Sequence, residues 1–345
     1  MISYASLAFT VLLTTSYGAS SANSQSVRPG HLPTAIASFG AAVQDGWLYV
    51  VGGHTGGKHE HSTDNLSAGF IRRRLDSDGG WETLPGSFPL QSVALVSDGR
   101  YLYRVGGMTA RNGPDEEEDL HSTAKVARFD PKLLRWSDLP PLPAPRSSHD
   151  AVVMDGKLYV AGGWKLAGSS DDGAWPTEHY VLELANPGEW RILPDARFQR
   201  RAVAVAGYRG LVYVLGGIDA EGEMSSRVDV LDVEGGVWSR GPDLPSHGFG
   251  ASAFAAYGRL FISGMNGEVY ALCEDGESWE TVAKLQTRRF FHRLVAGDRG
   301  QLVFIGGANR SGHLESIEVL DVSVPRSVGG DRAGQASRPR FRSVP

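Results

Sequence analysis

The chain has 345 residues, of which 41% are hydrophobic and 44 are glycine, and its formal net charge is −5. It is long enough to bury a large core, and its glycines lack the spacing of three that a collagen-like fibre requires. The small negative charge gives no general basis for nucleic-acid binding. One cysteine, Cys273, excludes an intramolecular disulfide.

The first 25 residues differ from the rest of the chain. Leu7–Thr15 is an apolar run too short to span a bilayer, and small residues follow it as far as Ala22. This pattern resembles a secretory signal, although no Lys or Arg precedes the apolar run. We expect residues 1–25 to be a signal peptide and linker, and the protein to be exported to a periplasm or the extracellular space. No other stretch approaches transmembrane length, so no stable membrane span is expected.

A phrase that ends in paired glycines recurs along the chain. In Asp155–Gly163 an Asp-Gly turn leads into a short hydrophobic run that stops at Gly162 and Gly163. Equivalent sites lie at positions 52, 106, 162, 216, 263 and 306, in steps of 54, 56, 54, 47 and 43 residues. A period near 50 predicts a β-propeller with one four-stranded blade per unit.

Tryptophan marks a second position in each repeat. A twelve-residue segment that reads as strand, turn and new strand ends at Trp81, Trp136, Trp190, Trp238 and Trp279, and Ser327 takes this position in the sixth unit. We expect each indole ring to begin the outermost strand of a blade and to lie between blades, with its N–H free to find a partner.

Together these positions resemble the kelch repeat family. The family pattern of a hydrophobic run, two glycines, a loop, a Tyr/Leu-Asp strand and a Trp appears here as LYVAGG, HYVLEL and Trp190, and as VYVLGG, VDVLD and Trp238. The resemblance covers about residues 26–325. It implies an all-β, six-bladed kelch-type propeller with four antiparallel strands per blade.

The two ends of the repeat region suggest how the ring closes. Leu32–Gly46 aligns without gaps to Leu142–Gly156, so the chain starts inside an outer strand at about Ser26–Pro33. This N-terminal strand is expected to complete blade six and remove the open sheet edges. Residues 326–345 are rich in Gly, Ser, Pro and Arg and are expected to form a disordered basic tail, or else an arm that grips an acidic polymer.

Strand direction decides which loops can act together. The loops between second and third strands share a face with the links between blades, and they are long in four units: Gly53–Gly69, Gly107–Ala124, Gly163–Glu178 and Gly217–Ser226. We call this the long-loop face. A site is expected there, near the central channel.

Aligning the links between blades places basic residues in two columns at the rim of this face. Arg146 aligns with Arg197 and Arg289, and three residues later His149 aligns with Arg200 and His292. Arg suits bidentate binding of carboxylate, sulfate or phosphate. The alternative is that each Arg binds neighbouring loop carbonyls. Arg227 and Arg310, on later loops, complete the predicted basic ligand-binding residues.

The long loops offer three further candidates. His54, His59 and His61 could form a metal site, but a solvated polar loop is favoured and no metal is predicted. The acidic run Pro114–His121 lacks an EF-hand pattern and is expected to be solvated. Trp164 and Trp175 lie beside carboxylates and could stack on a sugar, or either ring could pack under its own loop.

Two functions remain open. The first is a non-catalytic module, expected to be monomeric and free of cofactors, that binds an anionic glycan or a protein loop. The second is a carbohydrate-active enzyme, because some exported bacterial kelch propellers are N-acetylneuraminate epimerases. Resemblance to that group implies an acid directly after a blade's glycine and an Arg soon afterwards. Gly217 stands at the acid's place here, although Glu221, Glu223 and Arg227 follow.

Overall fold

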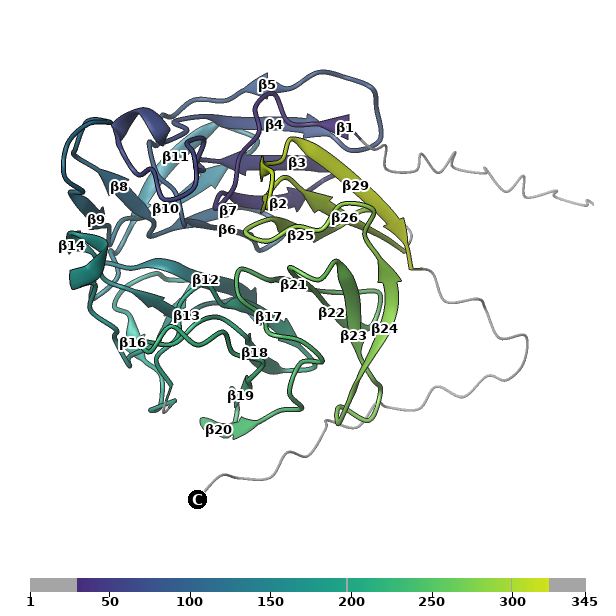
Figure 1. The fold of residues 1–345 in the computed structure, drawn as a ribbon. Coiled ribbons are helices and arrows are strands. Elements are labelled where there is room, and N and C mark those ends of the chain that lie inside the picture. Colours follow the sequence, from purple (N-terminus) through teal and green to yellow (C-terminus); the bar gives the residue numbers. More distant parts are fainter. Residues whose placement is uncertain (1–29, 197, 299, 323–345) are drawn as a thin grey trace, which may run out of the picture.

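The computed structural model describes residues 30–196, 198–298 and 300–322. These residues form six four-stranded antiparallel sheets arranged around a central axis (Figure 1). Blade one consists of β2 (Gly40–Gln44), β3 (Trp47–Val51), β4 (Phe70–Arg74) and β5 (Glu82–Thr83). Blade two consists of β6 (Ala94–Ser97), β7 (Leu102–Val105), β10 (Val126–Asp130) and β11 (Arg135–Leu139). Blade three consists of β12 (Ser147–Met154), β13 (Lys157–Trp164), β15 (Tyr180–Glu183) and β16 (Arg191–Ile192).

Blades four to six follow the same order from the channel outward. Blade four consists of β17 (Ala204–Tyr208), β18 (Leu211–Leu215), β19 (Val228–Asp232) and β20 (Val237–Arg240). Blade five consists of β21 (Ser252–Ala256), β22 (Arg259–Ser263), β23 (Glu268–Leu272) and β24 (Trp279–Lys284). Blade six consists of β25 (Arg293–Ala296), β26 (Gln301–Ile305), β29 (Ser316–Asp321) and the N-terminal β1 (Gly30–His31). The innermost strands of neighbouring blades contact one another all the way round, including β2 with β25. The predicted six-bladed propeller is therefore confirmed.

The N-terminal strand closes blade six as expected. Gly30 pairs with Ile317 and His31 pairs with Ser316, so β1 is the outer strand beside β29 (Figure 1). Residues 1–29 and 323–345 lie outside the described part of the chain, and with them the predicted signal peptide, basic tail and Ser327. Within the described ranges no helix is long and apolar enough to cross a membrane.

Turn chemistry explains why the repeated phrase is rich in glycine. At the hairpin Asp155-Gly156 both residues have positive φ, 51° and 73°, which is the geometry of the tight turns that join twisted strands. Gly162 and Gly163 also have positive φ, 71° and 91°. A Cβ on Gly162 would lie 2.6 Å from the Val203 side chain of the next blade, so only glycine allows the blades to approach this closely.

The tryptophans connect neighbouring blades. Each indole N–H donates to a carbonyl of the preceding blade at 2.8–3.1 Å, and the acceptors of Trp81, Trp136, Trp190, Trp238 and Trp279 are His31, Pro85, Pro140, Pro194 and Pro242. Trp81 reaches His31 of β1, which confirms that β1 occupies the place of an outer strand in the ring.

The long-loop face has a high side, covered by the long loops of blades one to three, and a low side, where blades five and six have short loops. Loops of the early blades form 3-10 turns at Thr63–Asn65 and Ser170–Asp172 and a small sheet of β8 (Met108–Ala110), β9 (Leu120–Ser122) and β14 (Ala167–Gly168). They pack around a core of their own: Leu66, Met108, Ala110, Leu120 and Leu166. By contrast, blade five joins β22 to β23 through residues 264–267 alone, and blade six carries the short hairpin β27 (Ala308–Asn309) and β28 (Gly312–His313).

Candidate functional site

A closed ring of backbone hydrogen bonds surrounds the mouth of the channel. One residue at the start of each blade has a left-handed backbone, with φ between 50° and 61°. Its N–H donates to the carbonyl of the equivalent residue on the preceding blade, at 2.6–3.2 Å. The six residues are Ser38, Ser92, Ser148, Ala202, Gly250 and Phe291. We call this the mouth ring. It holds the six links between blades in one register.

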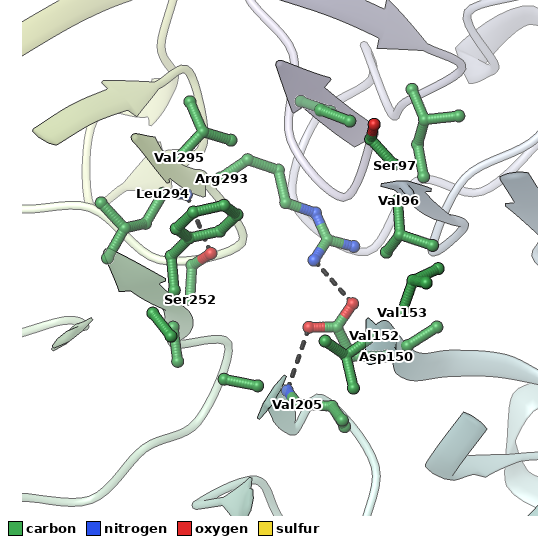
Figure 2. Close-up of a pocket in the computed structure, with 18 of the residues that line it drawn as sticks. Val96, Ser97, Asp150, Val152, Val153, Val205, Ser252, Arg293, Leu294 and Val295 are labelled. Atoms are coloured by element: carbon green, nitrogen blue, oxygen red, sulfur yellow. Dashed lines mark hydrogen bonds and ion pairs between the residues drawn. The ribbon is translucent and has the colours of Figure 1, made fainter. Parts of the chain in front are cut away.

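Below the mouth ring, an ion pair crosses the channel (Figure 2). Arg293 of β25 donates from Nη1 to Asp150 at 2.8 Å, from Nε to the carbonyl of Phe39 at 2.9 Å and from Nη2 to the carbonyl of Val93 at 3.1 Å. Asp150 also accepts from the N–H of Val205 at 3.1 Å. These bonds join blades six, one, two, three and four. Ser252 of blade five adds the remaining link by accepting from the N–H of Leu294 at 2.9 Å.

The ion pair leaves little open space near the mouth. The cavity beneath the mouth ring is about 50 Å³, which is room for about one or two water molecules. A larger cavity of about 340 Å³ extends from Asp150 and Arg293 towards the hairpin turns and is lined chiefly by alanine, valine and leucine side chains. The channel therefore offers few polar groups to a sugar.

The predicted arginine column lies inside the blades and not at an exposed rim. Arg146 and Arg289 have no exposed surface, and Arg200 is 4% exposed. Arg146 donates to the carbonyls of Gly162 and Glu178 at 3.1 and 2.7 Å, while Arg289 donates to those of Gly306 and Ser316 at 2.9 and 3.1 Å. The carbonyl-binding alternative describes these side chains.

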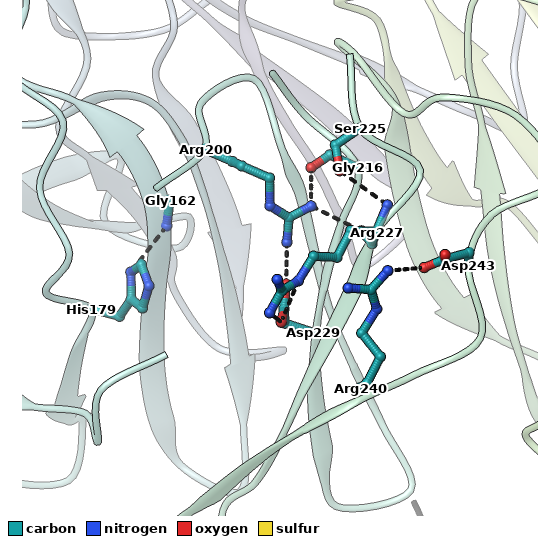
Figure 3. A network of polar contacts seen from close by, with 9 residues as sticks. All are labelled: Gly162, His179, Arg200, Gly216, Ser225, Arg227, Asp229, Arg240 and Asp243. Atoms are coloured by element: carbon teal, nitrogen blue, oxygen red, sulfur yellow. Dashed lines mark hydrogen bonds and ion pairs between the residues drawn. The ribbon is translucent and has the colours of Figure 1, made fainter. Parts of the chain in front are cut away.

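Arg200 occupies the same place in blade four, which corrects the predicted register (Figure 3). It donates to the carbonyls of Gly216 and Arg227 and forms a buried ion pair with Asp229, which Arg227 also contacts. The link from Leu193 to Arg200 is three residues longer than the link from Leu142 to Arg146, so an ungapped alignment chose Arg197. Arg197 itself lies outside the described residues.

His149 and His292 are also buried, at 3% and 2% exposure, and pack between blades. The ring of His149 lies against Gly106 of blade two, and His292 Nε2 is 2.7 Å from the Ser263 hydroxyl of blade five. Burial, together with the nearby charges of Arg146 and Arg293, lowers the pKa of His149 to about 3. Burial likewise lowers the pKa of His292. Both rings are neutral at physiological pH.

Trp164 and Trp175 lie together on the long-loop face. Their ring centroids are 5.9 Å apart, and both residues are half-buried. The cation above them is Arg201, whose guanidinium carbon lies 4.0 Å from the Trp164 ring centroid and 5.6 Å from that of Trp175. The sequence alignment placed the link into blade four three residues out of register, so it did not identify Arg201 as a candidate.

Three phenylalanines gather on the low side of the face. The ring centroids of Phe249, Phe290 and Phe291 are 4.9–6.3 Å apart, and all three residues are half-buried. They lie where blades five and six have short loops. We call these residues the mouth patch. The sequence offered a clue in the short segment 264–267, which is too short to cover the start of its own blade.

The remaining predicted residues are dispersed. His54 and His61 lie with ring centroids 4.9 Å apart, but the third ring beside them is His313 of blade six, and His59 is exposed elsewhere. Among the described residues no group of histidine, cysteine and carboxylate side chains is arranged to hold a metal. Arg310 is exposed at the tip of the β27–β28 hairpin.

Comparison with known proteins agrees with this architecture. The Kelch motif family matches residues 145–175 and 199–245, which lie in blades three and four. The chain therefore contains kelch motifs and folds as a six-bladed β-propeller.

Its curated relatives are longer proteins. It is 29% identical over 217 residues to Kelch repeat and BTB domain-containing protein 12 of Danio rerio, which covers 60% of this chain and 34% of that protein. It is 26% identical over 205 residues to Beta-scruin of Limulus polyphemus (59% and 21%), and 30% identical over 184 residues to Kelch-like protein terF of Aspergillus terreus (51% and 38%). The matches span about a fifth to two fifths of these relatives.

A solved structure shares the fold. The structure of YjhT superposes with a TM-score of 0.65 at 15% sequence identity, covering 84% of this chain and 99% of that chain. At this identity the likeness concerns the fold alone.

Proposed function

We propose that this protein is a binding module that holds an extended segment of a partner protein across the mouth patch. The observation that carries this proposal is the half-buried cluster of Phe249, Phe290 and Phe291 on the low side of the long-loop face. Aromatic side chains supply much of the binding energy at protein interfaces because they bury large apolar areas at low entropic cost.

Charge around the mouth patch favours a partner with acidic residues. His247 and Arg288 precede the patch phenylalanines by two residues and are exposed, and Arg310 is exposed on the adjacent hairpin. Ala308 of that hairpin bridges directly to Phe290. An apolar centre with a basic rim is complementary to a segment that combines an apolar or aromatic side chain with carboxylates.

The carbohydrate-active alternative finds less support at the mouth. It needs an acid and a base open to a sugar, yet each oxygen of Asp150 already accepts a hydrogen bond, one from Arg293 and one from Val205. At Gly217 the backbone has φ of 94°, and a Cβ there would lie 2.6 Å from the Arg201 carbonyl oxygen and 2.7 Å from the Val203 side chain, which leaves no room for an acidic side chain. Export through residues 1–25 stays a prediction, since those residues lie outside the described chain.

An array of short synthetic peptides tests the proposal. Each peptide pairs one phenylalanine with one aspartate at varied spacing, and binding is measured with the wild-type protein and with Phe290→Ser. We expect some peptides to bind the wild type and to lose about thirtyfold or more in affinity with Phe290→Ser, as for a hot-spot residue. Leu133→Ser, which also replaces an apolar side chain but on an exposed turn far from the mouth, serves as the control. Binding that survives Phe290→Ser, or that falls equally with Leu133→Ser, would contradict the proposal.

A further inference from the structure

Arg201 packs against two tryptophan rings on the long-loop face. Trp164 covers one face of its guanidinium at 4.0 Å, and Trp175 lies 5.6 Å away. The residue is half-buried, and its Nε has no hydrogen-bond partner. No described residue accepts a hydrogen bond from this side chain or forms an ion pair with it. The two rings hold the cation in place without neutralising it.

Three other arginines that are largely removed from water form an ion pair with a carboxylate. Arg200 pairs with Asp229, Arg289 with Glu318 and Arg293 with Asp150. Burial lowers the pKa of Arg201, and no nearby carboxylate acts to raise it. A desolvated cation with no counter-ion is costly, and an anion supplied from outside would relieve that cost.

The position of Arg201 places it beside the mouth patch. Arg201 immediately precedes Ala202 of the mouth ring, and Phe249 immediately precedes Gly250, the next residue of that ring. The N–H of Gly250 donates to the carbonyl of Ala202 at 3.0 Å, so the two links are hydrogen-bonded neighbours. A segment lying on Phe249 can therefore reach Arg201 on the next blade.

We propose that Arg201, Trp164 and Trp175 form a carboxylate-binding subsite for an aspartate or glutamate side chain of the partner segment. This inference rests on the proposed function and names the chemistry that the partner must carry. With its face against Trp164, the guanidinium presents its in-plane N–H groups, which match both oxygens of a carboxylate. Partial burial strengthens such a pair compared with one in open water.

The test uses the same peptide array with an asparagine copy of every aspartate peptide. Affinities are measured for the wild type, Arg201→Ala and Arg201→Lys, with Arg111→Ala as a matched control because Arg111 is an exposed arginine of the long-loop face outside the mouth patch and its rim. We expect the aspartate peptides to bind Arg201→Ala about tenfold or more weakly. The asparagine peptides should lose as much with the wild type and nothing further with Arg201→Ala. Arg201→Lys should recover part of the loss, and Arg111→Ala should change affinity little.

The outcomes separate this inference from the proposed function. If aspartate and asparagine peptides bind equally and only Phe290→Ser weakens them, the mouth patch stands and the Arg201 subsite is wrong. If no peptide binds, the proposed function itself fails. A third arm uses free N-acetylneuraminate. Binding of that sugar acid through Arg201, with no peptide binding, would overturn the protein segment as the source of the carboxylate. Thermal unfolding of each variant checks that a loss of binding is not a loss of folding.

Discussion

Arg200 and Arg201 are consecutive residues with opposite surroundings. Arg200 points into blade four, where it is 4% exposed and bound to Asp229 and to two carbonyls. Arg201 lies on the long-loop face against Trp164, without an anion among the described residues. Because successive side chains of an extended chain point to opposite sides, one position serves the interior and the next serves the face. Residue type alone therefore does not distinguish a structural arginine from a binding one.

The largest effect is expected inside the blade. Arg200→Ala leaves the buried Asp229 with the half-exposed Arg227 as its remaining ionic partner and frees two buried carbonyls. We expect a loss of about 3–5 kcal/mol in the free energy of unfolding, as for other broken buried ion pairs. Urea unfolding of wild type, Arg200→Ala and Arg201→Ala measures this. Equal losses in the two variants would erase the distinction between the neighbouring arginines.

The channel ion pair should come next. Asp150→Ala leaves Arg293 without its carboxylate, and Arg293 keeps two carbonyl acceptors and a side chain that is 19% exposed. Since water can reach part of the guanidinium, we expect a smaller loss of about 2–3 kcal/mol. Urea unfolding provides the value, and peptide binding at the mouth should stay unchanged. A stability equal to that of the wild type would mean that the channel pair contributes nothing net.

Lowering the pH should reduce the free energy of unfolding through the buried histidine His149 in the blade interior, more than it affects the long-loop face. An unfolded His149 takes up a proton below about pH 6.5, whereas the folded residue does so only near pH 3. Its contribution to stability is therefore complete above about pH 6.5 and is lost as the pH falls towards 3, by about 1.4 kcal/mol per pH unit.

His149→Val isolates this contribution, because Val93 and Val203 occupy the same position in blades two and four. Urea unfolding at several pH values should give a shallower pH dependence for the variant than for the wild type. Parallel curves would show that His149 binds protons alike in the folded and the unfolded protein, which would contradict the lowered pKa.

The smallest effect on stability is expected for Arg201→Ala. This change removes one cation–π contact and one uncompensated cation, so the free energy of unfolding should shift by about 1 kcal/mol or less. Thermal unfolding measures it beside Trp164→Ala, which also removes part of the loop core. A loss as large as that of Arg200→Ala would assign Arg201 to the interior and not to the face.

The fold could be predicted because it depends on repeated local features. Turns with positive φ, paired glycines and blade-bridging tryptophans occur at nearly constant spacing, and each has one structural explanation. The register between strands inside a blade is similarly fixed by the short Asp-Gly turns.

The site was less predictable because the links between blades differ in length. Arg146 follows Leu142 by four positions, whereas Arg200 follows Leu193 by seven, and no local rule determines this difference. Asp150 and Arg293 could have been recognised, since each follows a predicted histidine and must point to the opposite side of its strand. Exposure of the mouth patch depends on what the neighbouring loops leave uncovered, which a single sequence does not determine.

The closing strand also determines how the propeller responds to tension. β1 contributes two residue pairs to β29, and in an antiparallel pair Gly30 lies towards the same end as the last residues of β29. A force that pulls the two ends of the described chain apart therefore opens these hydrogen bonds one after another, instead of shearing them together. Blade six becomes the mechanical weak point, and the mouth ring then breaks between Ser38 and Phe291. The five other blades, each built from consecutive strands, would initially stay folded.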